Sequence, residues 1–305
     1  MQSSISQRLK TSNEIHLREE MPTHIINGRL IAQSIKESMT TKIKEFQKKY
    51  EISPKVITIK IGHDPSSELY LHLRNKACNE VGIKATEIDF ESSIPEKKVL
   101  NTIQQLNQDS SIHGIMIQYP IPEHLSQFQL MKAISPEKDV EGLHPQNLGQ
   151  TLLGNEYLVP CTPLAVMKII DHEQIGLTGK NVTIINHSNV VGKPLAVMCL
   201  NRNATTTVCH VYTENIKPYT QQADILIPAT GIPGLITGDH IKNDAIIIDV
   251  GIAPTPEGIK GDVERTTVEG KAAQLTPVPG GVGPVTIASS IYNIVQILET
   301  SIMKK

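Results

Sequence analysis

Short apolar segments rich in β-branched residues alternate with segments of helical periodicity, and this alternation is what most limits the fold. The clearest extended segment is VITIKI at residues 56–61, which ends at Gly62. It follows a stripe of apolar residues at helical spacing between residues 30 and 46, with Asn27-Gly28 as a turn before them. Strands separated by helices form parallel sheets whose two faces are covered. We therefore predict an α/β fold with parallel sheets.

The same rhythm continues along the chain, with one interruption. We expect helices at residues 67–81, 95–107 and 126–134, an apolar-striped helix at residues 287–302, and strands at residues 85–90, 114–119, 182–185, 206–209, 225–227 and 245–250. The stretch from residue 119 to 161 contains five prolines and little periodicity apart from the helix at 126–134. Long irregular segments in compact domains are often functional. We place a domain boundary near Pro160.

Composition excludes several classes of protein. The formal net charge of −2 offers no electrostatic attraction to nucleic acid or an anionic membrane, and without Trp the chain lacks the usual stacking platforms for bases. No apolar stretch approaches the roughly 20 residues needed to span a bilayer. The four cysteines lack CxxC spacing, so we expect no metal site and reduced thiols, as in a cytoplasmic protein.

The first 24 residues are charged and have no apolar core, so they are not a secretory signal. Two interpretations remain. They form a disordered extension, with Met21 as the natural start, or they form a cleaved organellar transit peptide. Glu14, Glu19 and Glu20 count against the transit peptide, because such peptides are poor in acidic residues.

A candidate dinucleotide site follows the strand expected at residues 182–185. The loop NHSNVVGKP at residues 186–194 leads into a helix, whose first N–H groups and dipole suit a pyrophosphate. Because the GxGxxG pattern is absent, an ordinary turn between strand and helix is an equal alternative, and the later glycines fit plain turns as well. The cofactor-binding candidates at the carboxyl ends of the strands are Asn186, His187, Ser188, Val191, Gly192, Lys193, Thr230, Gly231 and Ile252.

Cofactor choice depends on the strand that ends at Cys209. No acid follows it to bind a ribose 2′-hydroxyl, as NAD sites often provide. His187 and Lys193 offer positive charge to a 2′-phosphate instead. We therefore favour NADP and keep NAD as the alternative.

A second set of polar residues precedes the boundary. Tyr70 and Arg74 are four residues apart on one expected helix face, an arrangement that also fits a surface tyrosine packed on an arginine stem. Gln118 ends a strand. The run TPVPGGVGP at residues 276–284 cannot be helix or strand interior, so it forms a rigid loop whose backbone can approach a ligand closely.

Six segments occur together in this order: QYPIP (118–122), DVEG (139–142), PCTP (160–163), VGKP (191–194), IDVGI (248–252) and TPVPGGVGP (276–284). With them, the chain from about residue 25 onward resembles the methylenetetrahydrofolate dehydrogenase/methenyltetrahydrofolate cyclohydrolase family. The resemblance implies a folate-binding catalytic domain at residues 25–160 with 285–305. A Rossmann-like NAD(P)-binding domain at residues 161–284 then follows, the C-terminal helix returns to the first domain, and the protein is a homodimer.

The resemblance also implies two reactions and their residues. A hydride passes from 5,10-methylenetetrahydrofolate to NADP⁺, and water then converts the methenyl product to 10-formyltetrahydrofolate. Tyr70 would stack on the pterin, Gln118 would polarise the catalytic group at position 74, and Glu141 would hydrogen-bond the pterin. The loop backbone at Pro279, Gly280 and Gly281 would contact the substrate.

Three positions depart from the family pattern. Arg74 stands where the family has lysine, and arginine cannot release its proton at any accessible pH. Glu141 stands where the family has Asp, and Asn186 where it has Gly. We expect dehydrogenase activity with hydrolysis weakened or lost. The alternatives are a full bifunctional enzyme in which Arg74 and Glu141 compensate as a pair, and a folate- or nucleotide-binding protein without turnover.

Overall fold

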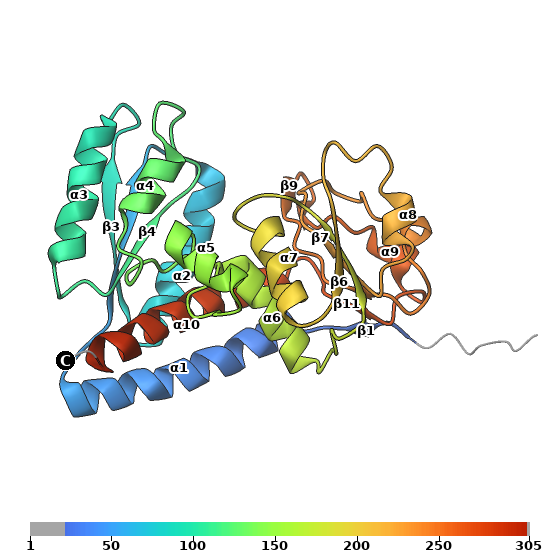
Figure 1. Cartoon of the computed structure of the whole chain (residues 1–305), viewed down its shortest axis with the longest axis horizontal. Helices are drawn as coiled ribbons and strands as arrows, with labels where there is room; N and C mark the ends of the chain where they lie inside the picture. Colours follow the sequence, from blue (N-terminus) through green and yellow to red (C-terminus); the bar gives the residue numbers. More distant parts are fainter. Residues whose placement is uncertain (1–21, 304–305) are drawn as a thin grey trace, which may run out of the picture.

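The computed structural model describes residues 22–303, with the side chains of residues 65–67 left aside. The predicted N-terminal extension lies outside the described residues. Two lobes stand side by side, and two long helices, α1 (Gly28–Tyr50) and α10 (Val282–Met303), run along them (Figure 1). Among the described residues, no helix is long and apolar enough to cross a membrane.

The first lobe is built on a parallel sheet in the order β3-β2-β4. Its elements are β2 (Lys55–Ile61), α2 (Pro65–Glu80), β3 (Lys84–Phe90), α3 (Glu96–Gln108), β4 (Gly114–Ile117), α4 (Gln127–Ala133) and α5 (Pro145–Leu152). Successive residues of a strand face opposite sides. Accordingly Val56 belongs to one apolar core while Ile57 and Ile59 belong to another. The predicted parallel sheet covered on both faces is confirmed.

The second lobe contains a six-stranded parallel sheet in the order β1-β11-β8-β7-β5-β6. Its strands are β1 (His24–Ile25), β5 (Asn181–Ile185), β6 (Thr205–Cys209), β7 (Ile225–Pro228), β8 (Ile246–Ile247) and β11 (Gln274–Leu275). Around them lie α6 (Cys161–His172), α7 (Gly192–Asn201), α8 (Lys217–Thr220), the 3-10 turn η1 (Gly238–His240), α9 (Arg265–Val268) and the antiparallel hairpin β9 (Ala253–Thr255) with β10 (Gly258–Lys260).

The two long helices join the lobes. Val285 and Ala288, in the first half of α10, belong to the core of the second lobe, whereas Ile291 and Ile294 further along belong to a core of the first lobe. α1 is divided in the same way. The predicted return of the C-terminal helix to the first domain is therefore confirmed. In contrast to the expected boundary at residue 25, β1 pairs with β11 in the second sheet.

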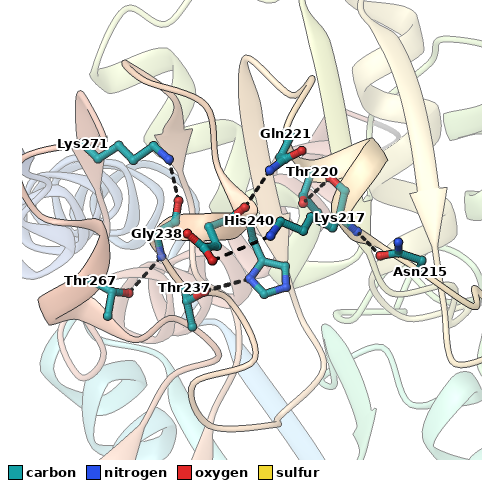
Figure 2. Close-up of polar contacts among 10 residues, drawn as sticks. Asn215, Lys217, Thr220, Gln221, Thr237, Gly238, His240, Thr267 and Lys271 are labelled. Atoms are coloured by element: carbon teal, nitrogen blue, oxygen red, sulfur yellow. Dashed lines mark hydrogen bonds and ion pairs between the residues drawn. The ribbon is translucent and has the colours of Figure 1, made fainter.

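A polar cluster fixes the connection between β7 and β8 at a place away from the interdomain cavity described below. Figure 2 shows Lys271 donating to the Gly238 carbonyl, at 2.6 Å, and Thr267 accepting from the Gly238 N–H, at 3.0 Å. From α8, Lys217 lies 3.7 Å from the Asp239 carboxylate. These groups bond one another, which is typical of a structural cluster.

Candidate active site

A cavity of about 1020 Å³ lies between the lobes and takes its lining from both. One side, which we name the α2 wall, consists of Leu69, Tyr70 and Leu73 of α2 together with Glu141. The opposite side, named the hairpin wall, consists of residues 229–231, 249–252 and Ile259. Loop 276–284, whose last three residues form the first turn of α10, closes the end between them. The prediction that no part of this run is helical is wrong at residues 282–284, because proline is tolerated in the first turn of a helix. A mostly apolar cleft with a few polar groups is typical of a site for a small organic ligand.

The α2 wall brings together two of the predicted residues. Tyr70 and Glu141 both line the cavity. Burial raises the pKa of Tyr70, so its hydroxyl stays protonated at neutral pH. Burial also raises the pKa of Glu141 to about 7, although the charge of Arg74 acts in the opposite direction. No residue that the structure describes donates a hydrogen bond to the Glu141 carboxyl group. Its oxygens therefore retain their capacity to bind a ligand.

Arg74 points into the protein rather than into the cavity. Its side chain is 1% exposed and donates to the hydroxyl of Thr58 on β2 and, at 3.3 Å, to Asn75 Oδ1. Its Nε has no partner among the described groups. The alternative in which Arg74 and Glu141 compensate as a pair finds no direct ion pair between them in the described structure, so any coupling between the two residues acts through space.

Gln118 is not among the residues that line the interdomain cavity. Its Nε2 donates to the Tyr119 carbonyl at 3.0 Å, and its side chain lines a smaller pocket of about 210 Å³ with Lys60 and His63. The sequence placed it correctly just after β4 but did not show which pocket it faces.

Loop 276–284 lies tightly against the start of α1. A Cβ at Gly28 would lie 1.8 Å from the Gly281 carbonyl oxygen, so only glycine fits there. Gly280 adopts a φ of +106°, which favours glycine for a second reason. Pro279, Gly280 and Gly281 line the cavity as predicted. Arg29 also lines it and was missed, because about 250 residues separate it from the loop and its local sequence carries no signal.

The nucleotide loop is organised by Asn186. Its Oδ1 accepts from the N–H groups of Ser188, at 2.8 Å, and Gly192, at 3.1 Å, and its Nδ2 donates to the Ala229 carbonyl at 2.7 Å. A Cβ at Gly192 would lie 1.9 Å from the Asn186 carbonyl oxygen. The loop therefore starts α7 in a tight turn at the carboxyl end of β5, as predicted, and Asn186 acts as an internal support.

The other cofactor candidates divide into two groups. Val191, Thr230, Gly231 and Ile252 line the cavity. His187 and Lys193 are exposed outside it, with the Lys193 ammonium 2.8 Å from Asn189 Oδ1. The ring of His187 lies 4.7 Å from that of His210, at the ends of β5 and β6. A helix N-terminus beside two loops at the carboxyl edge of a parallel sheet fits a dinucleotide.

Known protein families match both of the domains that line the cavity. Residues 26–141 match the catalytic domain of tetrahydrofolate dehydrogenase/cyclohydrolase, and residues 160–302 match its NAD(P)-binding domain. The chain is 43% identical to the bifunctional protein FolD of Methanosarcina barkeri, over 93% of this chain and 99% of that protein.

Two solved structures resemble the whole molecule. The bifunctional FolD enzyme of Campylobacter jejuni superposes with a TM-score of 0.88 at 40% identity, covering 91% of this chain and 99% of that one. The Trypanosoma brucei FolD enzyme, solved with NADP and an inhibitor, gives a TM-score of 0.89 at 31% identity, covering 92% and 99%. The chain therefore belongs to the tetrahydrofolate dehydrogenase/cyclohydrolase family.

Proposed function

We propose that this protein oxidises 5,10-methylenetetrahydrofolate to the methenyl form with NADP⁺ and hydrolyses that product to 10-formyltetrahydrofolate. The observation that carries the proposal is the cavity of about 1020 Å³, which is lined by both domains of a chain whose two halves match the two domains of this family. Such a cavity holds a folate against a nicotinamide.

Each wall has its own task. Tyr70 stacks on the pterin from the α2 wall, flanked by Leu69 and Leu73, and Glu141 faces the same ligand. The backbone of Pro279, Gly280 and Gly281 approaches the substrate closely. The N-terminus of α7, the backbone at Thr230 and Gly231, and the side chain of Ile252 would hold NADP⁺, which would serve as the hydride acceptor. We infer NADP over NAD from the basic residues His187 and Lys193 near the end of β5.

The hydrolysis step requires a group that exchanges a proton near neutral pH, and Arg74 cannot do so. We assign this role to Glu141, whose pKa is about 7 and which lines the cavity. One proton of water passes to the Glu141 carboxylate as the oxygen bonds to the methenyl carbon. When the bond from that carbon to N5 breaks, the proton returns to N5 and the remaining hydroxyl proton leaves to solvent. We expect hydrolysis to be weakened relative to oxidation, because the guanidinium of Arg74 cannot release a proton.

We further propose a homodimer that functions in the cytoplasm. The end of α5 exposes Leu152 and Leu153, and the neighbouring α7 exposes Leu200, so together they form an apolar surface of the kind that subunit contacts cover. The four cysteines are buried and unpaired, as expected for a reducing compartment. Light scattering measures the mass directly, and a mass equal to one chain would contradict the dimer.

A paired assay of the purified protein tests the proposed function. Methylenetetrahydrofolate is supplied with NADP⁺ or NAD⁺, and reduction of the cofactor and loss of added methenyltetrahydrofolate are followed separately in the near ultraviolet. We expect both activities, faster with NADP⁺. Tight folate binding with neither activity would replace the proposal with the alternative of a binding protein without turnover.

A further inference from the structure

Two buried carboxylates lie beneath the hairpin wall, one at each end of the segment that contains the β9–β10 hairpin. Asp249 lies two residues after β8 and lines the cavity, whereas Asp262 follows β10 and is completely buried. Asp249 is 3% exposed. Neither has been assigned a task in the reaction above.

Asp249 closes the base of the hairpin. Its Oδ1 accepts from the N–H groups of Gly251, at 2.9 Å, and Asp262, at 3.2 Å, and its Oδ2 accepts from Val263 N–H at 3.0 Å. The backbone N–H of Asp249 in turn donates to the hydroxyl of Thr276, at 2.8 Å. One residue therefore connects the end of β8, the far side of the hairpin and the beginning of loop 276–284.

Asp262 extends these connections to the end of β7. Its Oδ2 accepts from the N–H and the hydroxyl of Thr230, at 2.5 and 2.8 Å, and its Oδ1 accepts from Ile232 N–H at 2.9 Å. Carboxylates that accept several N–H bonds in a dry environment hold backbone segments firmly. Thr230 and Gly231 are thereby fixed relative to the hairpin.

Two glycines make the arrangement reciprocal. A Cβ at Gly251 would lie 2.0 Å from Asp262 Oδ1, and a Cβ at Gly261 would lie 2.1 Å from Asp249 Oδ2. Each carboxylate thus occupies the space that a side chain on the opposite segment would fill. This explains why both positions are glycine although neither has a positive φ.

We propose that Asp249 and Asp262 are positioning residues for the nicotinamide half of the cofactor. Together they hold the end of β7, the end of β8 and the base of the hairpin in the one arrangement that forms the hairpin wall. This inference rests on the proposed function, because it assumes that the hairpin wall faces the nicotinamide. The adenosine half is expected at the α7 loop, which neither carboxylate contacts.

The test compares the binding of whole NADP⁺ with that of adenosine 2′,5′-bisphosphate, a fragment without the nicotinamide. Calorimetry is performed on the full chain and on Asp262→Asn, Gly251→Ala and Thr230→Val. Gly251→Ala keeps both acids but displaces the Asp262 carboxylate. Thr230→Val removes the hydroxyl that donates to Asp262 and accepts from Ile232 N–H. We expect NADP⁺ to bind about tenfold more weakly to these variants, with the bisphosphate and folate affinities within about twofold of the original.

Asp224→Asn is the matched control, because Asp224 also accepts a backbone N–H, from Asn181 at 2.7 Å, but lies at the opposite end of β7. It should lower stability without changing NADP⁺ affinity. The positioning role would be overturned if NADP⁺ and the bisphosphate lost affinity equally. It would also be overturned if NADP⁺ affinity were unchanged in Gly251→Ala and Thr230→Val. If the unmodified protein binds no NADP⁺, the proposed function itself fails, which is a separate outcome.

Discussion

Glu141 and Asp249 face the same cavity from opposite walls, and burial raises the pKa of each to about 7. Asp249 accepts three backbone N–H bonds, whereas Glu141 accepts none from the residues that the structure describes. Buried polar groups normally find partners within the protein. The difference indicates that the hairpin wall is completed by its own backbone, while the α2 wall leaves a carboxyl group for the ligand.

The substitution with the largest expected effect on the difference between the two walls is Glu141→Gln. It keeps the shape of the side chain but replaces the titratable carboxyl group with an amide. Proton transfer by a positioned group contributes at least about 100-fold, so we expect hydrolysis of methenyltetrahydrofolate to fall by about that factor. Oxidation should fall much less. Steady-state assays of the two reactions measure both effects, and an equal loss in the two would contradict the assigned role.

A second prediction concerns the loop between the walls. Gly28→Ala places a Cβ against the Gly281 carbonyl oxygen, and overpacking of this kind costs about 1–3 kcal/mol. We expect the folate KM to rise about tenfold and the unfolding midpoint to fall. Gly149→Ala is the matched control, since a Cβ at Gly149 in α5 meets nothing within 4 Å. A folate KM unchanged in Gly28→Ala would show that the loop does not contact the substrate.

A smaller effect is expected from Arg74→Lys, which restores the residue of the family pattern. Lysine can release a proton, so the ratio of hydrolysis to oxidation should rise by about threefold to tenfold. The gain is limited because the side chain is directed toward Thr58. Arg202→Lys, at an arginine bound to Glu156 away from the cavity, serves as the control. A fall in the ratio would mean that the guanidinium itself is needed.

The smallest predicted effect concerns how the stability of the folded protein varies with pH. The pKa of Glu141 is about 7 in the folded protein and 4.5 ordinarily, so between these values the folded state holds a proton that the unfolded state has lost. The contribution of Glu141 to the free energy of unfolding is complete below about pH 4.5 and is lost as the pH rises to about 7. Thermal unfolding midpoints should therefore decline across this window by a few degrees, less steeply in Glu141→Gln. Identical slopes of the unfolding midpoint against pH in the two proteins would show that the Glu141 carboxyl group is hydrated in the folded state.

The regular elements were predictable because their apolar residues carry the periodicity. The strands at 55–61 and 181–185 were predicted within one residue of their observed ends, whereas α10 begins five residues before its predicted start. Short elements without periodicity were not found. They include α5, which begins with proline, the four-residue helices α8 and α9, the exposed β9–β10 hairpin, and the two-residue strands β1 and β11. The longer helix α6 was not predicted either.

The site was predictable only in part, since motifs give residue types but not the direction of side chains. Tyr70 and Glu141 line the cavity, whereas the neighbouring Arg74 is directed into the sheet and Gln118 faces another pocket. Asp249 lies in the IDVGI segment that the sequence had already singled out, whereas Arg29 enters the cavity through contacts with a segment distant in sequence. Such contacts depend on tertiary packing and leave no local pattern.

The most direct test of the contrast between the walls is the ratio of hydrolysis to oxidation, measured against pH in the unmodified protein and in Glu141→Gln. If Glu141 accepts the proton as a carboxylate, the ratio rises as pH passes through about 7 and then levels off, and the rise disappears in the variant. A rise of the same size in both proteins would contradict the account, because another group would then carry the proton.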